Sequence, residues 1–189
     1  MLFQNEKLTV RQLEEKDSSL LAKWLSDPEV LEFYEGRDNP FDLEKVQNKF
    51  FASAGQTSMC MVEYVGKEIG YIQFYELDAD TKKKYGIYTE NTYGTDQFIG
   101  ETDYWNKGIG TLLISSMVSY LIEHKKASRI VMDPQTQNTR AITCYEKCGF
   151  KKVKLLPNHE FHEGKYQDCW LMEFSRLSIS SKRKEGESS

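Results

Sequence analysis

Two glycines at the start of a predicted helix are the residues best suited to bind a ligand through backbone groups. Gly108 and Gly110 follow the apolar run 98–100 and begin a helix predicted over 107–123. Having no side chains, they leave backbone N–H groups uncovered at the positive end of the helix dipole, which favours phosphate. Lys107 adds a positive charge beside them. The pattern therefore predicts a phosphate-bearing cofactor at the N-terminus of this helix.

A Gly-x-Gly pair alone is also typical of an ordinary turn before a helix, so the neighbouring residues decide its meaning. A Walker loop places its lysine after the glycines, whereas Lys107 precedes both of them. A Rossmann fingerprint needs a third glycine at position 113, which is Leu113 here. The sequence therefore argues against both of these common nucleotide-binding folds.

A second motif follows about thirty residues later, after a short apolar strand that ends at Asp133-Pro134. Its members are Asn138, Ala141, Tyr145, Gly149 and Phe150. The two motifs together resemble the Gcn5-related N-acetyltransferase family. In that family the glycine turn binds the pyrophosphate of acetyl-CoA, and the second helix flanks the pantetheine arm. The resemblance covers roughly residues 6–174 and implies acetyl-CoA as the cofactor.

One position departs from the family pattern. Where the family usually has Gln or Arg, this chain has Trp105, so we expect that contact from the backbone or from Lys107. The resemblance implies a set of cofactor-binding residues: Phe98, Ile99, Trp105, Lys107, Gly108, Ile109, Gly110, Thr111, Asn138, Ala141 and Tyr145.

Acetyl transfer to an amine needs a polarised thioester carbonyl, an uncharged amine and a proton for the leaving thiolate. We expect the backbone N–H groups of Phe98 and Ile99 to polarise the carbonyl if Gly100 marks a bulge. Asp96, an acid in an apolar strand, is predicted to hold the amine and accept its proton, although an ordinary Asp is about six pKa units too weak to deprotonate an alkylammonium outright. Tyr145 is the predicted acid. The alternatives are a solvated carboxylate and a packing tyrosine.

Several segments resemble one branch of the family more closely, the aminoglycoside 6′-N-acetyltransferases. They are residues 30–38, 69–75, 96–100 and 132–134. Aminoglycosides carry ammonium groups on sugar rings, which carboxylates and aromatic faces bind. The predicted acceptor-binding residues are Tyr34, Glu35, Gln73, Tyr75, Asp96, Asp133, Glu160 and Glu163. For most of them an ordinary solvated charge or a core aromatic is the alternative.

Hydrophobic patterning predicts the elements that position these residues. Strands are expected over 7–13, 58–65, 68–77, 93–100, 128–132, 150–156 and 166–174, and helices over 18–26, 43–52, 107–123 and 138–148. Asp17 and Asp42 are the expected N-caps, and 78–92 is expected to be a loop. This order predicts one α/β (α+β) domain, an acyl-CoA N-acyltransferase fold by resemblance. Its seven-stranded mixed sheet is mostly antiparallel, with helices on both faces.

Composition restricts the remaining possibilities. The 189 residues suffice for one domain, expected over 1–174, and the tail 175–189 is predicted to be disordered. The net charge is −4 and the tail is basic, so the domain is acidic, which argues against nucleic acid and suits a cationic small molecule. The chain shows no 18-residue apolar run and no secretory signal, so we expect no membrane contact and a cytoplasmic location.

The thiol and imidazole groups give no metal-ligand spacing. The four cysteines, at 60, 144, 148 and 169, are expected to be reduced thiols. The segment 159–163, His-Glu-Phe-His-Glu, is interpreted as an acceptor-side loop. No metal is predicted.

Three functions remain open. The favoured one is acetyl-CoA-dependent acetylation of the 6′-amine of aminoglycoside antibiotics, a resistance activity. A second keeps the cofactor but acetylates a protein N-terminus, a polyamine or a siderophore precursor. A third is a non-catalytic acyl-CoA-binding regulatory module, against which Asp96 and Tyr145 argue. A monomer or a homodimer is expected.

Overall fold

One mixed sheet organises the chain, with the strand order β1-β2-β3-β4-β5-β6-β8-β7. The computed structural model describes residues 1–52 and 55–175. The strands are β1 (Phe3–Asn5), β2 (Leu8–Gln12), β3 (Ser58–Tyr64), β4 (Lys67–Glu76), β5 (Thr92–Ile99), β6 (Arg129–Met132), β7 (Lys151–His162) and β8 (Lys165–Ser175). All neighbours are antiparallel except β5 and β6, which are parallel. The predicted mixed, mostly antiparallel sheet is confirmed.

The sheet has eight strands, one more than predicted, because Phe3–Asn5 pairs with β2. A strand of three residues is too short to display an alternating pattern. β7 is also longer than predicted: it extends through a register shift between Leu156 and Glu160 and includes His159–His162. The segment expected to be a loop is therefore largely strand.

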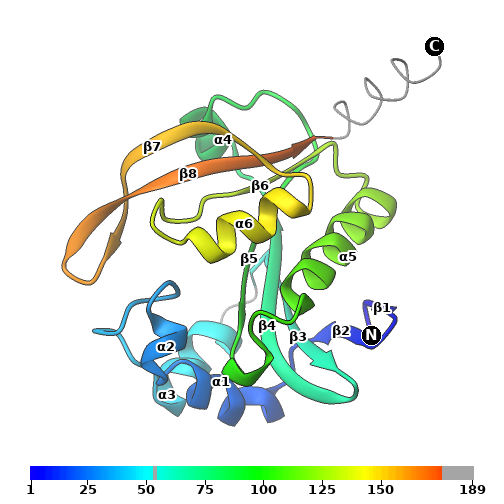
Figure 1. Cartoon of the computed structure of the whole chain (residues 1–189), viewed down its shortest axis with the longest axis vertical. Helices are drawn as coiled ribbons and strands as arrows, with labels where there is room; N and C mark the ends of the chain where they lie inside the picture. Colours follow the sequence, from blue (N-terminus) through cyan, green and yellow to red (C-terminus); the bar gives the residue numbers. More distant parts are fainter. Residues whose placement is uncertain (53–54, 176–189) are drawn as a thin grey trace.

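The longer helical segments lie on both sides of the sheet, as predicted. They are α1 (Ser18–Trp24), α2 (Pro28–Leu31), α3 (Leu43–Val46) continued by the π-helical η2 (Gln47–Phe51), α4 (Ala79–Tyr85), α5 (Ile109–His124) and α6 (Thr139–Lys147), with short 3-10 turns η1 (Glu15–Asp17) and η3 (Thr102–Tyr104). In Figure 1 the N-terminal helices, in blue, gather below α5 and α6, in green and yellow.

Successive residues of the central strands face opposite layers, as the period of a strand requires. On β3 the side chain of Met61 packs with α1–α3, whereas its neighbour Cys60 packs with α5 and α6. Tyr71 and Ile72 divide in the same way on β4. The two faces therefore hold separate apolar cores, and β4 and β5 lie between them.

The predicted caps have different outcomes. Asp42 caps α3 by accepting a hydrogen bond of 2.8 Å from the Lys45 N–H, which confirms that prediction. Asp17 makes no capping bond to α1, because its carboxylate accepts two bonds from Arg11, at 2.7 and 2.8 Å. Asp17 does stand at the N-cap position of α1, as predicted, but its side chain forms an ion pair with Arg11 and does not cap the helix.

The segment predicted as a loop over 78–92 contains α4. Asp78 caps this helix at the Thr81 N–H, and Gly86 ends it at a φ of +73°. These cap signals were present in the sequence, but α4 buries no residue and so lacks an apolar face that would reveal it.

The two ends of the described chain bear on two further expectations. Ser175 is the last residue of β8, and the rest of the predicted disordered tail, residues 176–189, lies outside the described residues. Within 1–52 and 55–175, no helix is long and apolar enough to cross a membrane. All four cysteines are free.

Candidate active site

The sheet opens between β5 and β6. The two strands pair only from Thr92 to Gly94 and then separate, whereas β5 stays paired with β4 as far as Ile99. The second edge of β5 is therefore open beyond Gly94, where a ligand can reach its backbone. A cavity of about 630 Å³, a size typical of small-molecule sites, lies there against α5 and α6.

β5 ends in a bulge, and just before it one backbone N–H faces the open edge. The N–H groups of Gly100 and Glu101 both donate to the carbonyl of Ile69, at 2.8 and 3.1 Å, so the bulge expected at Gly100 is present. Because antiparallel bonding alternates, the N–H of Ile99 faces the open edge and that of Phe98 faces β4. Of the two predicted carbonyl donors, only Ile99 is free of the ladder.

The start of α5 has the geometry of an anion seat. Gly108 is its N-cap at a φ of +78°, a conformation that glycine adopts without strain, and no side chain caps the helix. The first N–H groups of α5 are therefore uncovered by side chains. The predicted cofactor residues that line the cavity are Phe98, Ile99, Trp105, Gly108, Gly110, Thr111, Asn138, Ala141 and Tyr145.

The remaining two predicted cofactor residues do not line the cavity. Ile109 is 4% exposed and packs in the core, so only its backbone is available. The Lys107 Nζ lies 5.9 Å from the centre of the Tyr104 ring. The side chain expected to replace the missing family contact is thus not part of the lining, although Tyr104 beside it is.

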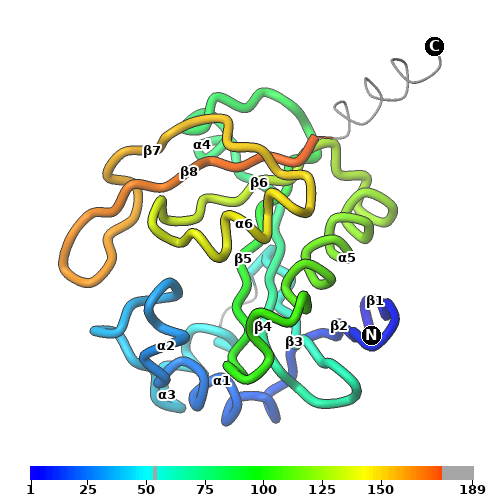
Figure 2. The backbone as a smooth tube through the Cα atoms, viewed as in Figure 1, coloured from blue at the N-terminus to red at the C-terminus, as the bar shows by residue number. Residues whose placement is uncertain are grey.

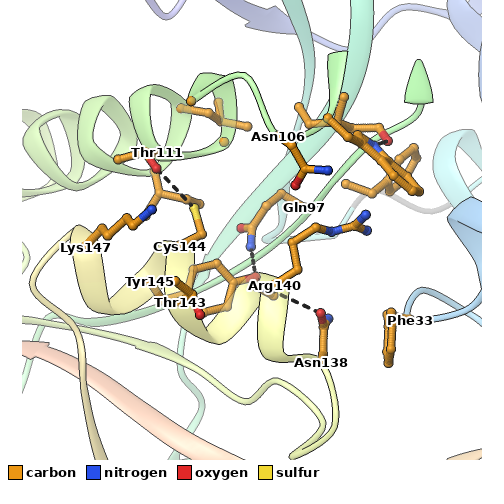
Figure 3. A pocket seen from close by; sticks show the side chains of 18 of the residues that line it. Phe33, Gln97, Asn106, Thr111, Asn138, Arg140, Thr143, Cys144, Tyr145 and Lys147 are labelled. Carbon is orange, nitrogen blue, oxygen red and sulfur yellow. Dashed lines mark hydrogen bonds between the residues drawn. The ribbon is translucent and has the colours of Figure 1, made fainter. Parts of the chain in front are cut away.

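Arg140 brings a different cation to the cavity. Its guanidinium carbon lies 3.8 Å from the centre of the Trp105 ring, and Trp105 in turn donates from Nε1 to the Ile99 carbonyl at 2.8 Å. Figure 3 shows Arg140 and Lys147, both from α6, among the lining side chains. Sequence reasoning missed Arg140, because a lone arginine on a helix is usually a solvated charge.

The proximity of Gly110 to Cys144 predicts a graded effect of side-chain size. A Cβ at Gly110 would lie 3.5 Å from the Cys144 Sγ, an ordinary contact, whereas the two further methyl groups of valine need more room. We expect Gly110→Val to weaken acetyl-CoA binding about tenfold, or ~1.4 kcal/mol, in titration calorimetry. Gly110→Ala is the matched control, and equal affinities for both variants would contradict a ligand seat at this turn.

Arg140→Gln is expected to weaken acetyl-CoA binding about fivefold at low ionic strength. Arg140 is exposed, so one ion pair with a phosphate contributes about 1 kcal/mol and is screened by salt. Titrations at two salt concentrations measure both effects. Lys83→Gln, which removes an exposed cation from α4, should leave the affinity unchanged. If Arg140→Gln bound acetyl-CoA as tightly as the wild type at both salt concentrations, Arg140 would not contact the phosphates.

Tyr145, the predicted proton donor, lines the cavity. Its hydroxyl oxygen accepts a hydrogen bond of 2.6 Å from the Gln97 Nε2, so its own proton remains available (Figure 3). Burial raises the pKa of Tyr145 even though the Gln97 hydrogen bond opposes this, so the hydroxyl is neutral at physiological pH. Gln97 is a second residue missed from sequence, because an isolated glutamine in a strand gives no functional signal.

A second cavity, of about 400 Å³, adjoins the first. Both cavities are bordered by Phe33, Tyr34, Gln97, Asn138 and Tyr145. Of the predicted acceptor residues, the second cavity is lined by Tyr34, Glu35, Gln73, Asp96, Asp133 and Glu160. Its polar, carboxylate-rich lining suits a cationic molecule. Such a molecule could reach the first cavity, which is called the cofactor cavity because the predicted cofactor residues line it.

Asp96 is held in place by a short chain of hydrogen bonds. The Tyr71 hydroxyl donates to the Gln73 Oε1 at 2.7 Å, and the Gln73 Nε2 donates to the Asp96 Oδ2 at 2.8 Å. Burial raises the pKa of Asp96 above that of an ordinary aspartate, and the Gln73 bond only partly offsets this. The carboxylate is therefore a better proton acceptor than the sequence suggested.

Asp133 is tuned in the opposite direction. Its Oδ2 accepts from the Tyr85 hydroxyl at 2.9 Å and lies 2.7 Å from the His159 Nε2. Burial opposes ionisation, but these two hydrogen bonds prevail and lower the pKa of Asp133, which keeps it negatively charged. Tyr85 and His159 were not predicted, since their roles depend on α4 and β7 meeting at the end of β6.

The other predicted acceptor residues have different surroundings. Glu163 does not line the cavity, because its two oxygens are bound by the Arg37 guanidinium at 2.6 and 2.7 Å. Glu35 is paired with Lys49 at the cavity wall. Tyr75 is absent from the lining and packs with β6, β8 and α4 residues. Glu160 has a raised pKa, chiefly because it is buried.

No cluster suggests a metal centre. Within residues 1–52 and 55–175, no group of three or more His, Cys, Asp or Glu side chains is placed to hold a metal ion. The histidines of the segment 159–163 have other partners, since His162 is buried and its Nε2 lies 2.7 Å from the Glu32 carbonyl.

Comparisons with known proteins agree with this geometry. A family model described as an acetyltransferase (GNAT) domain matches residues 14–157. The chain is 31% identical over 157 residues to an aminoglycoside N(6')-acetyltransferase type 1 of Klebsiella pneumoniae, which covers 78% of this chain and 76% of that protein. A structure of AAC(6')-Ib with ribostamycin and coenzyme A has a TM-score of 0.76 and 25% identity, covering 92% of this chain and 96% of the other.

The fold is shared with acetyltransferases of other acceptors. Spermidine N-acetyltransferase from Vibrio cholerae, in complex with CoA and spermine, has a TM-score of 0.73 at 21% identity and covers 92% of this chain and 98% of that one. The opening of β5, the uncovered start of α5 and the cavity between them fit a phosphate-bearing thioester. The chain therefore belongs to the GNAT acetyltransferases, and it is an N-acetyltransferase that uses acetyl-CoA.

Proposed function

We propose that this enzyme acetylates the 6′-amine of aminoglycoside antibiotics. The second cavity carries the proposal. Its lining includes the carboxylates of Asp96, Asp133 and Glu160, and it adjoins the cofactor cavity at Tyr145 and Gln97. Several ammonium groups on one acceptor would match several carboxylates in one cavity. The 31% identical relative is an aminoglycoside N(6')-acetyltransferase, and structures of AAC(6')-Ib at 25% identity contain ribostamycin or kanamycin.

Different residues of this chain are proposed to polarise the carbonyl, hold the amine and protonate the leaving sulfur. Bound acetyl-CoA supplies an activated acyl group, which the amine attacks directly. The N–H of Ile99 donates to the carbonyl oxygen as negative charge develops there. Asp96 holds the ammonium and accepts a proton, helped by its raised pKa, and Tyr145 donates its proton to the departing sulfur.

The remaining acidic groups recognise the acceptor away from the reacting amine. Asp133 stays ionised because His159 and Tyr85 lower its pKa, so it can pair with a second ammonium. Glu35 is already paired with Lys49, and Glu163 with Arg37. These two residues are therefore proposed to support the cavity wall and its rim rather than to bind the drug.

The proposed function is tested by the release of CoA thiol. Wild-type protein and acetyl-CoA are mixed separately with kanamycin, a linear polyamine and a basic peptide. We expect the highest kcat/KM with kanamycin and a mass increase of one acetyl group on the drug. Preferential turnover of the polyamine or the peptide would show that this acceptor class is the substrate. No turnover with any of the three would favour a non-catalytic acyl-CoA-binding protein.

A further inference from the structure

Two aromatic side chains are exposed near the tip of the β7–β8 hairpin. Phe161 and Tyr166 are 63% and 62% exposed, and they lie directly opposite each other in the strand register. Their ring centroids are 5.2 Å apart at an angle of 69°. The pair presents an exposed aromatic surface on which a ligand could pack.

The tip that carries these rings is held in place. Next to Phe161, His162 is buried and its Nε2 lies 2.7 Å from the Glu32 carbonyl. Glu163 binds the Arg37 guanidinium through both oxygens and accepts from the Arg37 N–H at 2.9 Å. Figure 2 shows the orange hairpin curving toward the blue α2 segment. The backbone that carries the rings is thus anchored, which lowers the entropy cost of ordering this hairpin around a ligand.

Phe161 also borders the second cavity, called the acceptor cavity because the predicted acceptor residues line it. It belongs, with Glu160 and Asp133, to the part of the lining that the cofactor cavity does not share. Asp96 and Tyr145 line the same acceptor cavity, and Tyr145 also borders the cofactor cavity. An acceptor whose amine reaches Asp96 and Tyr145 would therefore place its distant part near Phe161.

We propose that Phe161, supported by Tyr166, is a stacking subsite for the sugar ring farthest from the reacting amine. This inference rests on the proposed function. An aromatic face packs against the apolar C–H face of a sugar ring and attracts nearby ammonium groups, while Glu160 beside it supplies a carboxylate. A linear polyamine has no ring face to stack, so the subsite favours multi-ring aminocyclitols over polyamines.

The test compares Phe161→Ala with wild type on two acceptors that share the same reacting amine. Kanamycin has three rings, and neamine has two. We expect the KM for kanamycin to rise about tenfold with little change in kcat, and the KM for neamine to change less than about twofold. Titration calorimetry of kanamycin into the CoA-saturated protein, where no reaction occurs, should show the same tenfold loss.

Matched variants separate stacking from folding. Tyr88→Ala removes an aromatic ring that is 90% exposed and lies outside the cavity lining, and it should behave as wild type. Phe161→Leu keeps an apolar side chain and should show the KM rise, whereas Phe161→Tyr should retain the wild-type KM. A KM rise shared by Phe161→Tyr would overturn the stacking role.

The remaining outcomes distinguish the inference from the function on which it rests. If wild type acetylates kanamycin and Phe161→Ala matches Tyr88→Ala in KM and calorimetry, the subsite is overturned and the function stands. If Phe161→Ala changed the sedimentation coefficient of the protein but not the KM, Phe161 and Tyr166 would belong to an interface between copies of the chain, and the subsite would be overturned. If wild type releases no CoA with either drug, the proposed function is overturned, and the inference with it.

Discussion

Replacing Asp96 with Asn is expected to lower kcat/KM for kanamycin by a factor of about 10²–10⁴, the range of a positioned acid or base. The Asn side chain keeps the volume and can still accept a hydrogen bond from Gln73, but it carries no charge to hold an ammonium and takes up no proton. Because burial raises the pKa of Asp96, the wild-type carboxylate is an effective acceptor. Initial rates of CoA thiol release measure the loss.

The size of this loss should depend on pH in a predictable direction. As the pH falls through the raised pKa of Asp96, the wild-type carboxylate is protonated and its advantage over Asn disappears. At pH values above the pKa of the acceptor amine, about 10 for an alkylamine, the amine is already uncharged and the variant recovers. The ratio of the two rates should therefore be largest between these limits.

Asp80→Asn is the matched control for Asp96→Asn. Asp80 is exposed in the first turn of α4, so removing its charge should leave the profile unchanged. Acetyl-CoA affinity should also be the same in all three proteins, because Asp96 lines the acceptor cavity and not the cofactor cavity. Parallel pH profiles for wild type and Asp96→Asn would reduce Asp96 to a structural role. A loss of acetyl-CoA affinity in Asp96→Asn would place its side chain in the cofactor cavity.

Changing Tyr145 to Phe is expected to reduce kcat by a factor of about 10–10³ while the KM for kanamycin stays nearly constant. The ring and its packing against Phe150, at a centroid distance of 6.2 Å, are retained. Only the hydroxyl is lost, and with it the proton that the Gln97 hydrogen bond leaves available. Steady-state kinetics at neutral pH, where the raised pKa keeps Tyr145 protonated, provide the measurement.

Tyr120→Phe controls for the loss of a tyrosine hydroxyl as such. Tyr120 lies on α5, packs with Phe74 at 5.8 Å and does not line either cavity. Its removal should leave kcat unchanged. If Tyr145→Phe turned over as fast as Tyr120→Phe, Tyr145 would be a packing residue and another group would have to protonate the sulfur.

The sequence predicted well wherever a local pattern has a local cause. Gly108 and Gly110 mark the predicted cofactor turn: Gly108 has the positive φ that favours glycine, and both leave the start of α5 free of side chains. Asp42 marks a helix start because its oxygen bonds an amide three residues away. The packing of neighbours such as Cys60 and Met61 in opposite layers likewise follows from the pleat of a single strand.

Short-range pattern was insufficient where an element lacks a buried face. β1 was missed because its three residues show no period, and α4 because none of its residues is buried. Asp17 stands at the predicted N-cap of α1, but its oxygens bond Arg11, which lies close to it in the folded chain. The pairing of β1 with β2 and the ion pair between Arg11 and Asp17 are tertiary contacts, which local propensity does not encode.

By itself the sequence determined the family, nearly all the order of strands and helices, and the glycine turn at the start of α5, because these depend on periodicity and on residues close to one another in the chain. Only the tertiary structure decided which charges face the cleft. Arg140 reaches Trp105 across 35 positions, and Arg37 binds Glu163 across 126. The state of a charged group depends on burial and on its nearest partner, and both are set when distant segments of the chain pack together.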